Sequence, residues 1–197
     1  MSEAGPVQVG GEGTTRFPPC ALWDFAVALY GKPGCAPACL SLQARRGADV
    51  NLLLFALWAG ASGRGRLAPE ALARAAESVA PWHGKIVRSL RAARDALKCQ
   101  TFPAEPTLAQ NLRRRILALE LEAEHIEALI LASLAPPPAE PPAPAERRAR
   151  DGLFNMRAYL ATLGPGRDAQ DWADILALLA GAFPELDAAA LGAPIES

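Results

Sequence analysis

The clearest pattern of hydrophobic and polar positions lies in the middle of the chain, from Thr107 to Leu134. Its apolar residues recur at steps of three and four, the spacing that places side chains on one face of an α-helix. These residues are Leu108, Leu112, Ile116, Leu119, Ala123, Ile126 and Ile130. The pattern predicts one long amphipathic helix with its apolar stripe buried in a bundle.

Shorter helical segments flank this stretch, and glycine, proline and capping residues mark their ends. Gly47 is suited to end one helix in a left-handed conformation. Asp49 can cap the next helix, because its carboxylate can accept hydrogen bonds from the first free N–H groups. Pro81 suits a first helical position. We predict these helices at 19–30, 36–46, 50–61, 69–80, 82–98, 150–163 and 168–182, with a short last turn at 185–191.

The elements predict an all-α fold, since no useful stretch alternates apolar and polar residues as a strand does. We expect a compact multi-helix bundle around the long helix at about 107–134. Six prolines in the segment 136–144 indicate a semi-extended spacer. The expected organisation is a disordered tail at 1–16, a helical core domain at 17–135, a proline-rich linker at 136–146, and a C-terminal helical section at 147–197 that packs on the core.

The composition narrows the class of protein. Of 197 residues, 51% are hydrophobic and 6% are aromatic, and the formal net charge is -1. This apolar fraction supports a buried core and excludes disorder of the whole chain. The near-neutral charge argues against a protein that coats nucleic acid or anionic lipid. An arginine run at 113–115 keeps RNA or ribosome association as a weaker alternative, although aromatic residues for base stacking are missing there.

The chain carries no pattern of a secretory signal, and its longest charge-free apolar run, 50–63, is shorter than the roughly 20 residues of a membrane span. We therefore expect a cytoplasmic protein with reduced cysteines. Cys35 and Cys39 are one helical turn apart, so with His83 or Cys99 they could form a zinc site. Paired Cys-x2-Cys elements are absent, however, and we expect small buried thiols and no metal.

Motifs that carry common chemistry are also absent from the sequence. It has no dinucleotide-binding glycine motif, Walker loop, nucleophile elbow or His-Glu-x-x-His segment. Its histidines, His83 and His125, fall on different predicted helices. We therefore predict neither catalytic residues nor a cofactor. The sequence argues against an enzymatic role without excluding one.

Polar residues placed among apolar ones are the remaining candidates for a site. Asn51 shares a helical face with Leu54 and Trp58, and Arg94 lies one turn from two leucines expected to be buried. A buried charge needs a partner, or it costs several kcal/mol. We expect a buried polar network or pocket formed by Asp49, Asn51, Arg94, Arg115, Glu120 and Glu124.

A helical hairpin about the loop 99–107 would place residues level when their numbers sum to about 206. In that register Arg91 stands beside Arg115, and neither has an acid nearby in the hairpin. Arg94 stands beside an apolar residue, so Asp49, Asp24 or an inward-facing Glu120 should supply the carboxylate. The network either fixes the packing of the bundle or lines a pocket for a small anionic or polar ligand.

Several runs resemble an uncharacterised family of short bacterial proteins. They are LWDFA at 22–26, CLSLQ at 39–43, GADVNLLLF at 47–55 and VAPW at 79–82, and the resemblance covers about residues 20–134. It implies an all-helical cytosolic bacterial protein and nothing catalytic. It also includes the polar positions Asp49, Asn51, Arg94, Glu120 and Glu124.

The function expected from these observations is that of a non-enzymatic interaction or adaptor module with a protein partner. The alternative is a bundle, possibly enzymatic, that binds a small polar or anionic ligand through the buried polar set. The two differ in a testable way, because a ligand needs a roomy polar cavity whereas a partner needs an exposed apolar patch.

Overall fold

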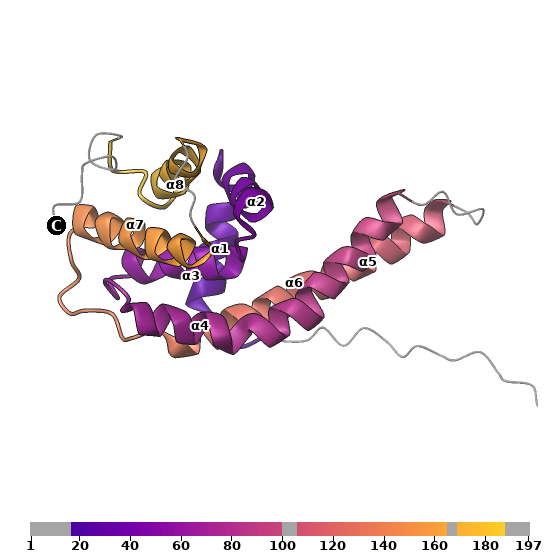
Figure 1. Ribbon diagram of the computed structural model, residues 1–197, viewed down its shortest axis with the longest axis horizontal. Coiled ribbons are helices and arrows are strands. Elements are labelled where there is room, and N and C mark those ends of the chain that lie inside the picture. Colours follow the sequence, from indigo (N-terminus) through magenta and orange to yellow (C-terminus); the bar gives the residue numbers. More distant parts are fainter. Residues whose placement is uncertain (1–16, 100–105, 165–168, 188–197) are drawn as a thin grey trace, which may run out of the picture.

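The computed structural model describes residues 17–99, 106–164 and 169–187, and within these ranges the protein is helical with no strand (Figure 1). This confirms the predicted all-α class. The elements are α1 (Ala21–Tyr30), α2 (Cys35–Arg46), α3 (Val50–Ala61), α4 (Pro69–Trp82), the π-helical segment η1 (His83–Val87), α5 (Arg88–Cys99), α6 (Pro106–Leu134), α7 (Ala145–Thr162) and α8 (Ala169–Ala182). None of the described helices is both long and apolar enough to cross a membrane.

Helix α3, rather than the long helix, lies at the centre of the core. Nine consecutive residues, 52–60, are buried, so the helix is enclosed on every side. Helix α7 crosses it where Gly60 meets Gly152, and a Cβ atom on Gly60 would lie 2.5 Å from Gly152 Cα. The two glycines therefore allow the helix backbones to touch.

Ion pairs attach α8 to α2. Arg45 contacts Asp171 at 2.7 Å and Asp174 at 2.6 Å, while Arg46 contacts Asp171 at 2.6 Å. Arg46 also donates to the carbonyl of Leu160 at 3.0 Å. Beneath these pairs Cys35 and Cys39 are fully buried, as expected of small thiols, and burial raises the pKa of Cys39 to about 12.

Pro81 lies inside a continuous helical run, so the predicted helix start at 81–82 is wrong. Helix α4 passes through Pro81 into η1, where Arg88 N–H donates to the carbonyl of His83 five residues earlier. Proline has no N–H to donate to the preceding turn, and the wider π turn that follows absorbs the disturbance without ending the helix.

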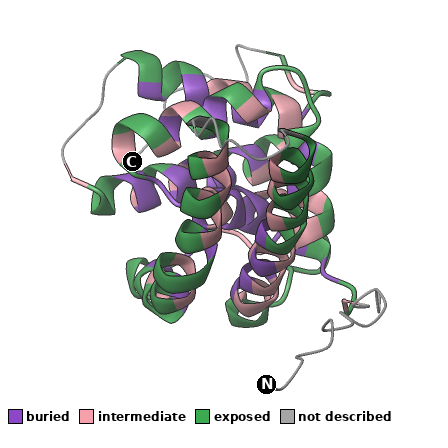
Figure 2. Ribbon diagram, turned by 90° about the vertical axis from the view of Figure 1, so that its right-hand side faces the viewer, coloured by how far each residue is buried: buried purple, intermediate pink, exposed green. Residues whose placement is uncertain are grey.

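Helices α5 and α6 pair as a hairpin that projects from the body (Figure 1). We call α5 together with residues 106–121 of α6 the arm. Exposed residues predominate on it (Figure 2). The buried stripe predicted for this part of α6 is wrong, since Leu108, Leu112 and Leu119 are 62%, 47% and 51% exposed. Only two helices pair here, so one side of α6 has no neighbour among the described residues.

The C-terminal helices share the core with the N-terminal ones. Helix α7 begins at Ala145, five residues before the predicted start, directly after the last proline of the linker. The linker backbone is tied to the body where Ala139 N–H donates to the carbonyl of Gly63 at 2.9 Å. The predicted tail at 1–16, the predicted helix start at residue 168 and the end of the predicted last turn lie outside the described residues.

Candidate functional site

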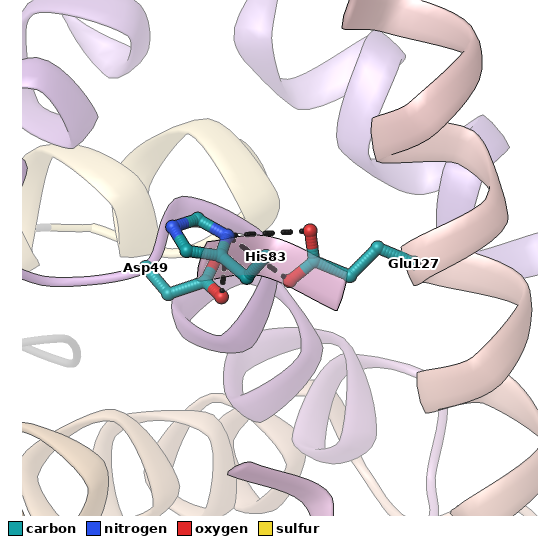
Figure 3. Close-up of side chains that lie close together, drawn as sticks. All are labelled: Asp49, His83 and Glu127. Carbon is teal, nitrogen blue, oxygen red and sulfur yellow. Dashed lines mark hydrogen bonds and ion pairs between the residues drawn. The ribbon is translucent and has the colours of Figure 1, made fainter. Parts of the chain in front are cut away.

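Three ionisable side chains from separate parts of the chain meet at the inner end of the arm (Figure 3). Asp49 precedes α3, His83 opens η1, and Glu127 lies in α6. His83 Nδ1 is 3.0 Å from Asp49 Oδ2 and 3.3 Å from both Glu127 Oε1 and Oε2. One imidazole nitrogen thus faces two carboxylates. We call these residues the acid–histidine cluster.

Asp49 is held in place by its capping role, as predicted. Its Oδ1 accepts from Asn51 N–H at 2.9 Å and Leu52 N–H at 3.5 Å, which leaves Oδ2 to face His83. The backbone is fixed from the other side, because Asp49 N–H donates to the Tyr159 hydroxyl at 2.8 Å. Helices α3 and α7 together therefore position this carboxylate.

Burial and mutual contact set the charges of the cluster. Desolvation and the nearby Glu127 raise the pKa of Asp49 to about 8. Burial alone would raise the pKa of Glu127, but hydrogen bonds with His83, Asp49 and Asn51 lower it. Burial also opposes the charge on His83, but the two carboxylates outweigh it and raise its pKa. Of the two carboxylates, Glu127 is therefore the one that loses its proton more readily.

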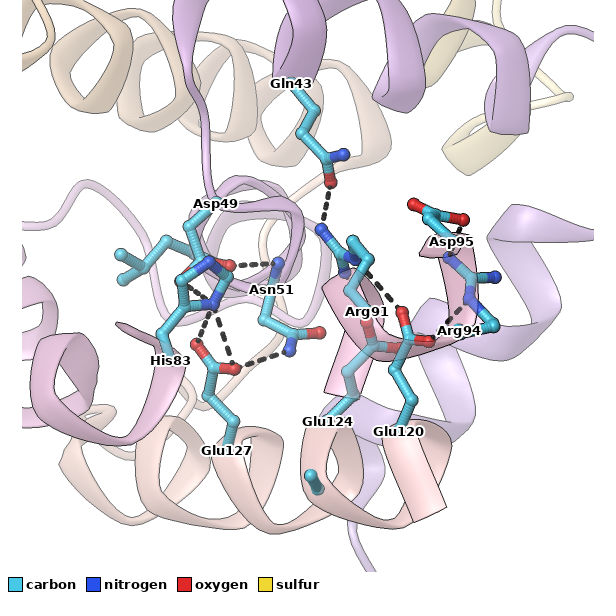
Figure 4. A network of polar contacts seen from close by, with 12 residues as sticks. Gln43, Asp49, Asn51, His83, Arg91, Arg94, Asp95, Glu120, Glu124 and Glu127 are labelled. Atoms are coloured by element: carbon cyan, nitrogen blue, oxygen red, sulfur yellow. Dashed lines mark hydrogen bonds and ion pairs between the residues drawn. The ribbon is translucent and has the colours of Figure 1, made fainter. Parts of the chain in front are cut away.

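A second set of charges lies on α5 and α6, one to two helical turns from the cluster (Figure 4). Arg91 contacts Glu120 at 3.0 Å and Glu124 at 2.7 Å, and it donates to Gln43 Oε1 of α2 at 2.7 Å. Arg94 lies 2.9 Å from the other oxygen of Glu120. This arginine–glutamate network joins α5 to α6 and to the body.

An open pocket of about 670 Å³ lies beside the cluster. Asp49 and His83 form part of its wall, whereas Glu127 does not line it and is fully buried. The pocket is bounded by α2, α3, α4, η1, α5 and α7. Its other polar lining residues are Gln43, Arg88, Arg91, Asp95, Tyr159 and Thr162.

Five of the six predicted polar residues fall into two groups in the structure. Asp49 and Asn51 belong to the surroundings of the acid–histidine cluster, where Asn51 Nδ2 donates to Glu127 at 3.1 Å. The remaining acids and Arg94 form the arginine–glutamate network, and the inward-facing acid predicted for Arg94 is Glu120.

Two parts of the prediction for the hairpin are wrong. Arg115 is exposed and outside both groups, because it lies on the open side of α6. Arg91 does not lack an acid in the hairpin, since it contacts both Glu120 and Glu124. The predicted register itself is shifted, because these contacts pair residues whose numbers sum to about 211 to 215 rather than 206.

His83 and Glu127 were not among the site residues predicted from the sequence. A signal for Glu127 was present, since Glu120, Glu124 and Glu127 follow the four-and-three spacing of one helical face. His83 had no comparable signal. Its position depends on a π turn that follows Pro81, and the sequence suggested a helix start there instead.

Fold and site define an all-helical protein with a buried acid–histidine cluster beside an open pocket. A family model described as "Protein of unknown function (DUF2390)" matches residues 21–131, which is more than half of the chain, and the protein belongs to this family. The match confirms the resemblance to an uncharacterised family, and its range contains all three cluster residues. No match to the chain was found among curated proteins or among solved structures.

Proposed function

We propose that this protein binds a small molecule with an apolar body and an anionic group in the pocket beside Asp49 and His83. The observation that carries the proposal is the convergence of ionisable side chains from several elements on one open pocket of about 670 Å³. That volume falls within the range of sites for small ligands.

The pocket wall offers both kinds of contact that such a molecule needs. Leu52, Val79 and Leu163 supply apolar surface. Arg88 is an exposed cation in the same wall and has no ion-pair partner among the described residues. An arginine fork of this kind matches a carboxylate or phosphate. The charge therefore favours an anion at the α5 side of the pocket.

Ligand-observed NMR on the full chain tests this proposal. Benzoate and phenyl phosphate should bind, whereas benzamide, which has a similar ring and no charge, should bind more weakly. Arg88→Ala should weaken anion binding, and Arg74→Ala, an exposed arginine of α4 outside the pocket, is the matched control. Equal binding of benzoate by Arg88→Ala and by the native protein would refute the anion site.

A second candidate function, a protein-interaction module, is favoured by the open side of the arm. Leu108, Leu112 and Leu119 share one face of α6 because steps of four and seven residues return to the same side, and all three are exposed. Exposed apolar side chains grouped on a projecting element are typical of a surface that packs against another protein. Arg114 and Arg115 beside them suit a helix with an apolar face and acidic flanks.

Cross-linking with mass spectrometry tests this surface. A cognate partner should give cross-links to residues 108–119 that disappear in Leu112→Ser/Leu119→Ser. Leu134→Ser is the control, since Leu134 is 45% exposed at the opposite end of α6. Cross-links that the double variant retains would place the interaction elsewhere and refute this candidate.

We place the protein in the bacterial cytoplasm. This placement is supported by three free, buried cysteines, Cys20, Cys35 and Cys39, which suit a reducing compartment. Fractionation of bacterial cells that produce the chain with an epitope tag would test it, with the protein expected in the cytosolic fraction.

A further inference from the structure

The acid–histidine cluster has the spacing of a metal site. Ligands that share a metal at about 2.0 to 2.2 Å lie about 3 to 3.5 Å from one another. His83 Nδ1 lies 3.0 Å from Asp49 Oδ2 and 3.3 Å from Glu127 Oε1, and one donor atom from each residue falls within 4.8 Å of the others. Each donor comes from a different element, so the folded chain alone brings them together.

Glu127 provides an independent indication of a missing positive charge. Its side chain is fully buried, and its Oε1 makes no hydrogen bond of good geometry, only a 3.3 Å ion-pair contact with His83 Nδ1 (Figure 3). A carboxylate oxygen buried without a donor is costly, and such an atom in a native structure calls for an explanation such as a bound ion. A cation between the three residues would satisfy this oxygen directly.

We propose that Asp49, His83 and Glu127 bind one divalent transition-metal ion, with Zn²⁺, Mn²⁺ or Fe²⁺ as the class. An imidazole together with two carboxylates suits these ions, whereas Ca²⁺ and Mg²⁺ prefer more oxygen ligands or retained waters. The two carboxylates balance the charge of the ion. Asn51 donates to Glu127 at 3.1 Å, so it orients that ligand without itself contacting the metal.

The arrangement is that of a site with open coordination positions. Three protein ligands leave at least one position of a tetrahedral ion for water or another molecule. Asp49 and His83 line the open pocket while Glu127 lies behind them, so the free position faces the pocket and solvent. An ion can therefore enter through the pocket, and a pocket ligand can reach it.

Metal titration of the full chain tests the proposal. Protein treated with a chelator and dialysed is titrated with Zn²⁺ by calorimetry and with Co²⁺ by visible absorption. We expect one ion per chain, Co²⁺ bands of a nitrogen–oxygen site, and a melting temperature that rises with metal concentration. Glu127→Gln and His83→Gln should each weaken binding by at least about 100-fold, because each removes a direct ligand.

Two further variants make the result decisive. Asp49→Asn keeps a residue that caps α3 well, so it tests the ligand without removing the cap. His125→Gln is the control for adventitious binding by an imidazole. His125 lies on α6, the helix of Glu127, but its ring stacks on that of Trp23 with 4.6 Å between the ring centroids. Melting curves recorded without metal identify any variant that does not fold. If one ligand variant fails to fold, the metal affinities of the other ligand variants test the proposal.

Unchanged affinity in the folded ligand variants, or loss of binding only in His125→Gln, would overturn the metal site. The titration contains no organic anion, so its failure would leave the proposed binding function intact. Conversely, failure of benzoate and phenyl phosphate to bind would leave the metal proposal intact.

Discussion

The α3–α7 crossing and the arm show two ways in which this chain joins a pair of helices. At the crossing, Gly60 and Gly152 bring the backbones into contact inside an apolar core. In the arm, α5 and α6 are held at their inner end by arginines and glutamates, and leucines stay exposed further out. The candidate site lies where these two kinds of packing meet. There, polar groups are buried deeply enough to interact strongly and remain near solvent.

The largest expected effect is at the crossing. Gly60→Ala should destabilise the protein by about 4 kcal/mol or more, because the new methyl group meets backbone atoms of α7 that cannot turn aside. Chemical denaturation followed by circular dichroism measures the change. Gly84→Ala is the control, since a Cβ atom at Gly84 would have no neighbouring atom within 4 Å. This variant should be neutral or slightly stabilising.

Removal of Arg91 should come next. Arg91→Ala leaves Glu124 and part of Glu120 without a cation, so we expect a loss of about 3 kcal/mol in the free energy of unfolding. Arg94→Ala should cost less, about 1 to 2 kcal/mol, because Glu120 keeps its contact with Arg91. Urea unfolding of both variants measures the order. A larger loss from Arg94→Ala than from Arg91→Ala would show that Arg94, and not Arg91, is the central cation of the network.

A smaller effect is expected at the edge of the acid–histidine cluster. Tyr159→Phe removes the hydroxyl that accepts Asp49 N–H at 2.8 Å, which leaves a buried donor unpaired. We expect a loss of about 1 to 2 kcal/mol, measured by thermal unfolding. Tyr30→Phe, on a 40% exposed tyrosine of α1, is the control and should change little. Equal losses from both would argue against this hydrogen bond.

The smallest effect is expected at the outer part of the arm. Leu112→Ser/Leu119→Ser should change the free energy of unfolding by less than about 0.5 kcal/mol, because both side chains are already solvent-exposed. Leu131→Ser, on a fully buried leucine of the same helix, is the contrasting control and should be strongly destabilising. A large loss from the double variant would mean that these leucines are covered in the folded protein.

The helices could be predicted well where local chemistry alone decides them. Gly47 ends α2 with φ 65°, and Asp49 caps α3, both as expected from residue type. The face that a helix buries was predicted less well, because burial depends on which neighbours exist. The outer part of α6 has an apolar stripe, Leu108, Leu112 and Leu119, that no described helix covers, whereas Glu120 and Glu127 are buried on another side.

Part of the candidate site could be predicted, again because only local signals can be found from the sequence. Asp49 and Asn51 could be found because a cap and a polar residue in an apolar helix are local signals. The approach of His83 to Glu127 joins residues 44 positions apart through a helix distortion at Pro81. No local pattern specifies such a distance. The exposed position of Arg115 likewise follows from the tertiary arrangement of the arm and not from its own neighbours in sequence.

The π turn at η1 determines which way the arm's inner side chains point. In a regular α-helix, side chains four residues apart drift by about 40° at each step, so a line of them winds around the axis. The wider turn cancels that drift and keeps Val79, His83 and Val87 facing the body, with Arg91 following. Deleting a single residue from this turn would rotate everything beyond it by about 100°. The extra residue of the π turn therefore sets the direction in which all charged side chains beyond it point.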